Sequence, residues 1–104
     1  MQQDRKPGQA ETAKIARRIE HLDRATRVTI KAHRNDAGKT QQQMAEYMGW
    51  TDDQQQNAES GKRALKISEF IVQAEGMGED PRVVFESLLD WEETHRPGSK
   101  LRRK

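Results

Sequence analysis

The side chains that most often carry catalysis are few and scattered in this sequence. His21, His33 and His95 have no companion at the spacing of a metal site and no nucleophile close by in the sequence. The chain has no cysteine, which excludes thiolate metal ligands and disulfide bonds. Its carboxylates form no pair in apolar surroundings, and there is no glycine-rich phosphate loop. We therefore expect a protein that is not an enzyme and that carries no cofactor.

A different chemistry is available between Thr40 and Arg63, where uncharged polar side chains predominate. The stretch has the layout of two short helices joined by a tight turn at Gly49, and a second glycine and two basic residues close it. This layout is typical of a helix-turn-helix, which places its second helix in the major groove of DNA. That helix opens with Asp52-Asp53, however, and carries almost no positive charge.

The segment before these two helices is predicted to be helical as well. From Ala10 to about Ala37 there is no Pro or Gly, which favours one long helix, or two helices with a bend near residues 25–26. Ile15, Ile19 and Leu22 recur at helical spacing and form an apolar stripe. This stripe needs a partner, either the domain itself or a second chain.

Start and stop signals divide the rest of the chain into four shorter helices. Thr40 with Gln43 and Thr51 with Gln54 have the spacing of capping boxes. A fourth helix is expected from about residue 68 to 76, and Asp80-Pro81 marks the start of a fifth helix that fades past residue 91. Since no stretch alternates as a strand would, the fold class is predicted to be all-α.

The apolar positions of these helices predict a small core. Its expected members are Ile30, Met44, Ala45, Met48, Ile67, Phe70, Ile71, Ala74, Val84, Phe85 and Leu88. We divide the chain into a disordered N-terminal arm (1–9), a basic helical extension (10–25), a helix-turn-helix domain (26–92) and a flexible basic tail (93–104).

Several stretches occur together at one characteristic spacing: "IKAHR" (30–34), "AGKTQQQMAEYMGWT" (37–51), "ESGKR" (59–63) and "SEFIVQAEGMGEDPRVVF" (68–85). Together they resemble the lambda-repressor/Cro-like helix-turn-helix of the xenobiotic-response-element (XRE) family of bacterial and phage regulators, over residues 26–90. The resemblance implies a five-helix domain, here with an extended N-terminal helix and disordered termini. It also implies binding to double-stranded DNA.

The resemblance further implies which residues contact DNA. Seven residues match such positions: Gln41, Thr51, Asp53, Gln54, Asn57, Lys62 and Arg63. Gln41 would reach a phosphate or a base edge, and Thr51 a phosphate. Asp53, Gln54 and Asn57 would contact the bases, and Lys62 and Arg63 the DNA backbone. Gln and Asn can pair with adenine, and Asp can accept a hydrogen bond from cytosine. The alternative interpretation is that these side chains are only the solvated face of a packed helix.

The sequence also departs from the family pattern. Gln55 stands where the family usually places Val or Ile, and Ala58 stands where it places a larger residue. Thr26, His33 and Lys39 likewise replace aliphatic residues. Burying Gln55 without partners would cost about 1–3 kcal/mol. We therefore expect the third helix to be loosely anchored or tilted.

Charge is distributed unevenly along the chain. Residues 1–39 hold ten Lys/Arg against five Asp/Glu (net +5), residues 40–99 hold five against twelve (net −7), and the final "KLRRK" adds +4. If the protein binds DNA, the cations must come largely from the N-terminal helix, residues 62–63 and the tail. We expect a sequence-specific DNA-binding transcriptional regulator that acts as a homodimer. The alternative is a protein-interaction module, an antiactivator or adaptor that binds another regulator through its acidic face.

The length of the apolar runs indicates whether the chain could enter a membrane. No run approaches the ~20 apolar residues that a membrane span needs, and the N-terminus lacks an apolar signal core. We therefore expect a cytoplasmic protein without a membrane partner.

Overall fold

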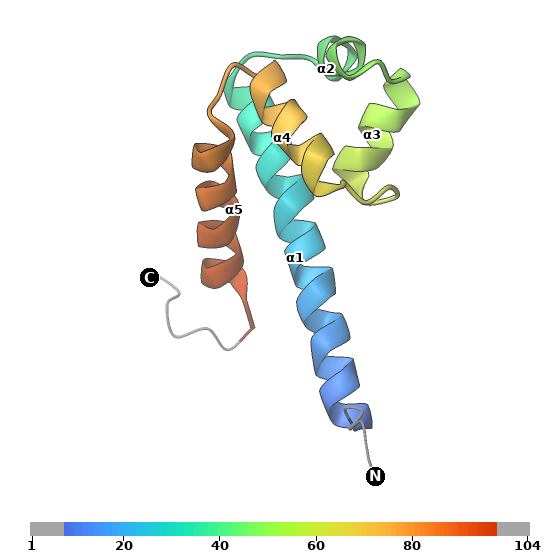
Figure 1. Ribbon diagram of the computed structural model, residues 1–104, viewed down its shortest axis with the longest axis vertical. Coiled ribbons are helices and arrows are strands. Elements are labelled where there is room, and N and C mark those ends of the chain that lie inside the picture. Colours follow the sequence, from blue (N-terminus) through green and yellow to red (C-terminus); the bar gives the residue numbers. More distant parts are fainter. Residues whose placement is uncertain (1–7, 98–104) are drawn as a thin grey trace.

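The computed structural model describes residues 8–97, which form five α-helices (Figure 1). The helices are α1 (Gln9–Asp36), α2 (Gln41–Met48), α3 (Asp52–Ser60), α4 (Ile67–Gly76) and α5 (Pro81–His95). The described residues contain no strand, which confirms the all-α prediction. None of these helices is long and apolar enough to cross a membrane. Most of the predicted arm and residues 98–104 of the predicted tail lie outside the described residues.

The predicted capping boxes form and define where α2 and α3 begin. Thr40 Oγ1 accepts a hydrogen bond from the Gln43 backbone N–H at 3.0 Å, and the Gln43 side chain accepts one from Thr40 N–H at 2.8 Å. Thr51 and Gln54 repeat this exchange at 3.2 and 2.8 Å. Each box satisfies two of the backbone donors that a helix N-terminus leaves free.

The turn between α2 and α3 depends on Gly49. Its φ of +73° lies in the left-handed region, where a side chain would be strained. The N–H of the next residue, Trp50, donates to the Ala45 carbonyl at 2.8 Å, which closes the end of α2. The chain therefore changes direction within the three residues 49–51 and places α3 across α2, as a helix-turn-helix requires.

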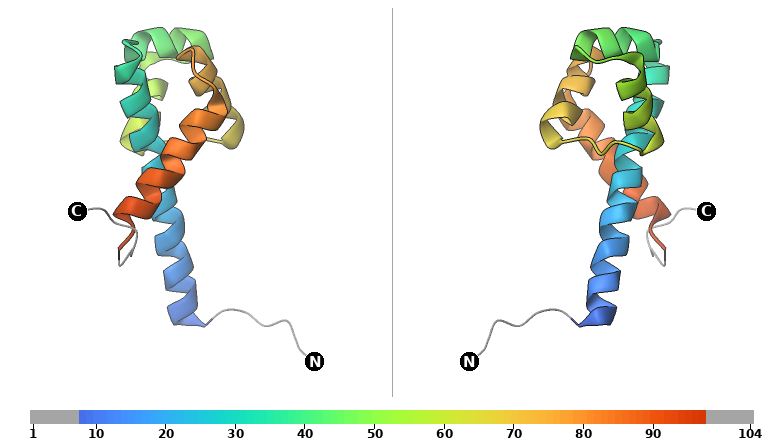
Figure 2. Two further views of the ribbon diagram at one scale, coloured as in Figure 1. Left: turned by 90° about the vertical axis from the view of Figure 1, so that its left-hand side faces the viewer. Right: turned by 90° about the vertical axis from the view of Figure 1, so that its right-hand side faces the viewer.

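α1 joins the domain to a protruding segment. It is a single helix, so the predicted boundary at residues 25–26 falls inside continuous helix, and Ala25 itself is buried. Thr26 Oγ1 donates to the Leu22 carbonyl at 2.8 Å without ending the helix. The C-terminal half of α1 packs between α5 on one side and α3 on the other, while its first turns extend beyond the other helices (Figures 1 and 2).

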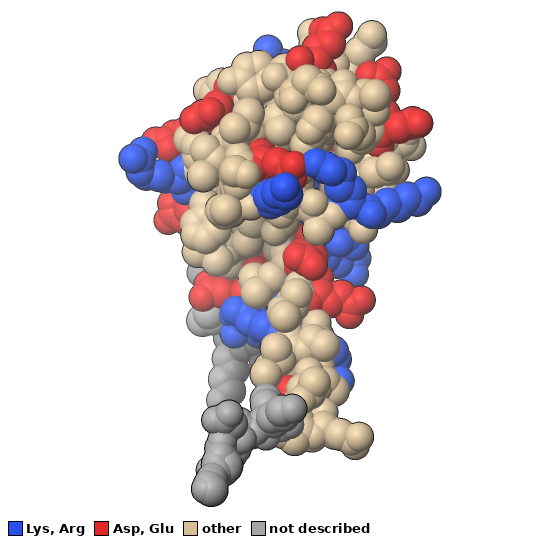
Figure 3. All heavy atoms as spheres, turned by 45° about the vertical axis from the view of Figure 1, so that its right-hand side comes forward, with Lys and Arg blue, Asp and Glu red and all other residues tan. Residues whose placement is uncertain are grey.

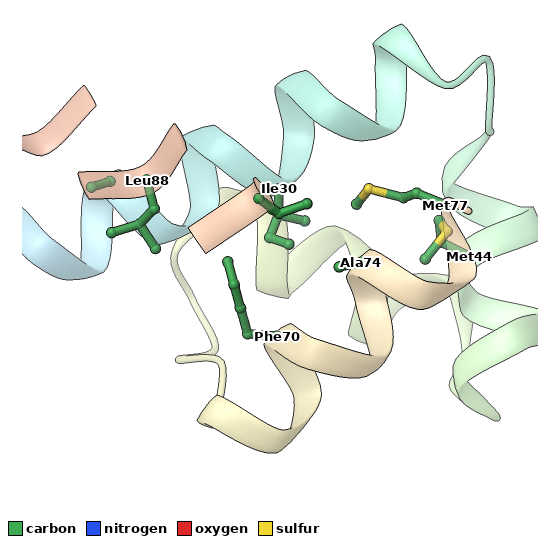
Figure 4. Packing of buried hydrophobic residues seen from close by; sticks show 8 residues of the cluster. Ile30, Met44, Phe70, Ala74, Met77 and Leu88 are labelled. Carbon is green, nitrogen blue, oxygen red and sulfur yellow. The ribbon is translucent and has the colours of Figure 1, made fainter. Parts of the chain in front are cut away.

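The hydrophobic core is made from one face each of α1, α2, α4 and α5 (Figure 4). Seven of the predicted core residues are buried: Ile30, Met44, Ala45, Phe70, Ala74, Val84 and Leu88. The prediction was wrong for Ile67, Ile71 and Phe85, which are 67, 39 and 43% exposed, and Met48 is only partly buried. The apolar faces of α4 and α5 are wider than the surface that their neighbours in the described chain cover.

The C-terminal end of α5 also differs from the prediction. The helix continues to His95 because its last turns pack against α1, where the rings of His21 and Trp91 lie 5.5 Å apart. Glu92 is buried there and forms ion pairs with Arg18 and Arg96. The predicted start of the tail at residue 93 therefore falls inside this helix, which includes residues 93–95.

Candidate nucleic-acid interface

A buried pair of amides fixes α3 against α4. Gln55 and Gln73 are both fully buried and exchange two hydrogen bonds. Gln55 Nε2 donates to Gln73 Oε1 at 3.2 Å, and Gln73 Nε2 donates to Gln55 Oε1 at 2.8 Å. Gln55 Nε2 also donates to Glu59 Oε2 at 2.9 Å. Because the polar groups are paired, the burial of these amides is compensated.

A buried ion pair continues this network to α1 and α2. The Arg34 guanidinium donates to both carboxylate oxygens of Glu59, at 2.7 and 3.0 Å, in a bidentate pair. Arg34 Nη1 also donates to the Lys39 carbonyl at 2.8 Å, and Gln41 Nε2 donates to Glu59 Oε1 at 3.0 Å. One connected set of hydrogen bonds therefore joins α1, α2, α3 and α4. We call these five side chains the buried polar network: Arg34, Gln41, Gln55, Glu59 and Gln73.

The network overturns the expectation that α3 is loosely anchored. That expectation assumed that Gln55 would be buried without partners, whereas its partners come from α3 and α4. Two other polar replacements of aliphatic residues are also paired: His33 Nδ1 lies 2.6 Å from Glu79 Oε1, and Thr26 bonds to the backbone. Polar contacts thus replace apolar ones at these positions, and α3 is held in place.

The outward face of α3 brings together three of the predicted base-contacting residues. Asp53, Gln54 and Asn57 lie within about 100° of one another around the helix axis, and the centre of this arc lies about 120° from that of the buried Gln55 and Ala58. The side chains of Asp53 and Asn57 make no hydrogen bond within residues 8–97, and Asp53 is exposed while Asn57 is partly buried. The Gln54 side-chain oxygen is engaged in the capping box, so its amide N–H groups are the donors that remain.

The predicted backbone-contacting residues differ in their availability. Lys62 is exposed, and Thr51 is exposed at the start of α3 although its hydroxyl caps the helix. Gln41 is bound to Glu59 within the buried polar network. The Arg63 guanidinium lies 4.6 Å from the centre of the Trp50 ring, and its Nη2 donates to Glu69 Oε2 at 2.6 Å. Contact with phosphate would require Gln41 and Arg63 to share or exchange these partners.

The outer surface of α2 and α3 is acidic. Residues 40–61 contain four carboxylates and no Lys or Arg. Glu59 is buried against Arg34, which leaves Glu46, Asp52 and Asp53 exposed. Figure 3 shows acidic side chains along the upper rim of the face on which α3 comes forward, with a band of basic side chains and further acidic ones below. Phosphates near α3 would therefore depend on Lys62 and on cations from other elements.

Sequence reasoning missed the residues that position α3. Arg34 and Glu59 lie in the quoted stretches "IKAHR" and "ESGKR", but 25 residues separate them, and nothing in the sequence pairs them. Gln73 was also missed, because it looks like a polar residue on the solvated face of α4. The departure at Gln55 was the available signal, since a buried amide requires a partner somewhere in the fold.

Hydrogen bonding sets the charge state of the two buried glutamates. Burial by itself would raise the pKa of Glu59, but hydrogen bonds from Arg34, Gln41 and Gln55 outweigh it and hold that pKa below its ordinary value. Hydrogen bonds from Arg96, together with the charge of Arg18, likewise outweigh burial and lower the pKa of Glu92. Both carboxylates are therefore ionised at neutral pH.

These lowered pKa values predict a loss of stability in acid. The unfolded chain binds protons at both glutamates near pH ~4.3, above the pKa that each has in the folded state. The stabilisation is complete above about pH 5 and is lost as the pH falls through the folded-state values. Urea unfolding between pH 3 and 7 should show this decline, and a Glu59→Gln, Glu92→Gln variant should show a shallower one. Equal slopes for the two proteins would contradict the prediction.

Comparison with known proteins supports the fold. No protein-family model and no curated protein sequence matches the chain. Among solved structures, an XRE-family like protein from Pseudomonas syringae pv. tomato str. DC3000 is similar, with a TM-score of 0.64 and 24% sequence identity. The match covers 81% of this chain and 98% of that chain. At this level of identity the similarity shows a shared helical fold and leaves the ligand open.

Proposed function

We propose that this protein is a sequence-specific transcriptional regulator that binds double-stranded DNA by placing α3 in the major groove. One observation carries this proposal: hydrogen bonds of the buried polar network join α3 to α1, α2 and α4, while its outward face presents the polar groups of Asp53, Gln54 and Asn57. Fixed amide groups on a helix are suited to base-edge recognition, because a bidentate contact requires a defined geometry.

In this proposal Gln54 and Asn57 donate to bases, Asp53 accepts from a cytosine, and Thr51 and Lys62 contact phosphates. Gln41 and Arg63 act chiefly by positioning the ends of α2 and α3. We also propose that the protein works as a homodimer in the cytoplasm. Ile15 and Ile19 support this, because they are 50 and 54% exposed on the protruding part of α1, where a second chain could cover them.

Asn57→Ala tests the role of α3. The substitution removes a base contact and is expected to cost about 1–3 kcal/mol on the preferred sequence, with little effect on random DNA. The preferred sequence would first be selected with the wild-type protein from a random duplex library, and both affinities would then be measured by fluorescence anisotropy. Asn35→Ala, at an exposed position near the end of α1, is the matched control.

Two further results decide how this test is interpreted. A thermal melt of the Asn57→Ala protein must match that of the wild type, because Asn57 is partly buried. If the sequence preference survives in Asn57→Ala and in Gln54→Ala, α3 is not the element that reads DNA.

The acidic outer surface favours a second candidate function. Glu46, Asp52 and Asp53 would repel phosphates but would attract a basic protein surface. In that case the protein is an antiactivator or adaptor that docks on another regulator and uses the helix-turn-helix only as a scaffold. Reversing charges on this surface separates the two candidates, because it changes DNA binding and docking in opposite directions.

A further inference from the structure

Among the described residues, basic side chains gather in a groove between residues 14–27 of α1 and the C-terminal end of α5. The groove has a volume of about 630 Å³. Six basic side chains line it: Lys14, Arg17, Arg18, Arg24, Arg27 and Arg96. Glu20 is the one carboxylate among the described lining residues. We call this surface the α1–α5 groove.

Two of these cations are held in place by a buried carboxylate. Buried Glu92 accepts hydrogen bonds from Arg18 and Arg96, so one carboxylate ties both guanidinium groups to the wall of the groove. Arg17 and Arg24 differ from them, because both are exposed and neither forms an ion pair within residues 8–97. Both guanidinium groups are therefore available to a ligand.

The spacing of the cations fits a regular polyanion. Lys14, Arg17 and Arg24 lie within about 80° of one another around α1 and extend over about 15 Å along its axis. A DNA strand carries one phosphate per ~3.4 Å of helix axis, so a strand that follows the groove would meet several cations. The described lining contains no Ile, Leu, Val, Met or Phe, whereas the centre of a protein interface is usually apolar and poor in charge.

The groove and the loop after α3 lie on largely different sides of α1, and Arg27 is the one described residue that lines both the groove and the small pocket beside that loop. Asp23 and Thr26 face the loop that follows α3, where they line a small pocket with Gly61 and Arg63. Helical periodicity places these two residues roughly 160° around α1 from the centre of the Lys14, Arg17 and Arg24 face. Figures 1 and 2 show the same arrangement, with α5 and α3 on opposite sides of α1. A straight duplex seated on α3 would therefore not enter the groove.

We propose that the α1–α5 groove is a second DNA site, which binds the phosphate backbone of a duplex without sequence preference and independently of α3. This inference rests on the proposed function in that it takes DNA as the ligand of the protein. The outer surface of α2 and α3 is acidic, and the groove would supply the phosphate contacts that give most of the non-specific affinity for DNA. The groove supplies general affinity, and α3 supplies selectivity.

An Arg17→Gln, Arg24→Gln variant tests the groove. Its binding to a fluorescein-labelled random-sequence duplex would be followed by anisotropy at several salt concentrations. Loss of two phosphate contacts is expected to reduce the slope of log K against log[salt] by about 1.8 units and the affinity at 0.1 M salt by about 50-fold. The matched control is Lys66→Gln, Arg82→Gln, which removes the same charge from exposed positions on other elements and should keep the wild-type slope.

The possible outcomes separate this inference from the proposed function. If both variants lose affinity equally, net charge alone is responsible and the groove is not a site, while the Asn57→Ala test of α3 remains valid. If the groove variant keeps its slope, the groove inference is wrong and reading by α3 still stands. If Asn57→Ala retains the wild-type sequence preference while the groove variant loses its slope, the groove inference holds and α3 is not the reader. If the wild type binds no duplex, both are overturned.

A protein ligand would give another distinct result. The groove could instead hold the acidic α2–α3 surface of a second copy of the chain. Sedimentation would then show self-association that Arg17→Gln, Arg24→Gln abolishes, with DNA binding unchanged, and this result would overturn the groove as a DNA site.

Discussion

Replacing Glu59 by alanine is expected to reduce the free energy of unfolding by about 3–5 kcal/mol. The side chain of Arg34 is only 9% exposed, and without Glu59 its charge would keep a single partner, the Lys39 carbonyl. Gln41 and Gln55 would lose an acceptor in the same step. The cost is therefore mainly that of leaving a buried charge with one carbonyl partner and removing one acceptor from each of two amides, rather than the intrinsic strength of the ion pair.

Urea unfolding followed by circular dichroism at pH 7 would measure this loss. Glu86→Ala, at an exposed position on α5, is the control and should change stability by no more than about 0.5 kcal/mol. An Arg34→Met, Glu59→Met variant removes both charges and should recover much of the lost stability. A loss below about 1 kcal/mol in Glu59→Ala would show that the network does not anchor α3.

Reversing two charges on the acidic outer surface of α2 and α3 is expected to strengthen DNA binding by about 10- to 100-fold at 0.1 M salt. Glu46 and Asp52 are exposed on α2 and α3, and neither is a proposed base contact. Changing both to lysine removes two repulsive charges and supplies up to two phosphate contacts beside α3. Asp53 is left unchanged because it is proposed to accept a hydrogen bond from a base.

The control for this variant is Glu86→Lys, Asp90→Lys, which changes the net charge equally at exposed positions on α5. Fluorescence anisotropy on the selected duplex should show the large gain only for the α2–α3 variant. The second candidate function predicts the reverse, because a basic partner would lose its docking surface. Unchanged or weaker DNA binding by Glu46→Lys, Asp52→Lys would therefore count against α3 as the DNA-reading helix.

Because Gln41 and Arg63 are bound within the domain, the results for the Glu59→Ala variant and for the groove variant can be interpreted together. Gln41 binds the same carboxylate that neutralises Arg34, so a change at Glu59 alters both the anchoring of α3 and the start of α2. The groove variant touches neither residue. Weakened sequence preference in Glu59→Ala together with normal preference in Arg17→Gln, Arg24→Gln would assign selectivity to the buried polar network and general affinity to the groove.

The sequence by itself determined the features that depend on neighbours three or four residues apart. The capping boxes at Thr40 and Thr51 and the turn at Gly49 could be predicted, because each depends on a side chain or a backbone angle within one helical turn. The periodic burial of Phe70 and Ala74 was predictable for the same reason. Local hydrogen bonds and helical period therefore specify the number, order and approximate limits of the helices.

The tertiary structure alone decided which polar residues meet and which apolar residues remain exposed. Gln55 meets Gln73 across 18 residues, and Arg18 meets Glu92 across 74, and no local pattern records such pairings. The exposure of Phe85 depends in the same way on how far neighbouring helices reach. Helical periodicity identifies the apolar face of a helix, but burial depends on whether another element covers that face. The anchoring of α3 and the basic α1–α5 groove both arise from contacts between helices far apart in the chain.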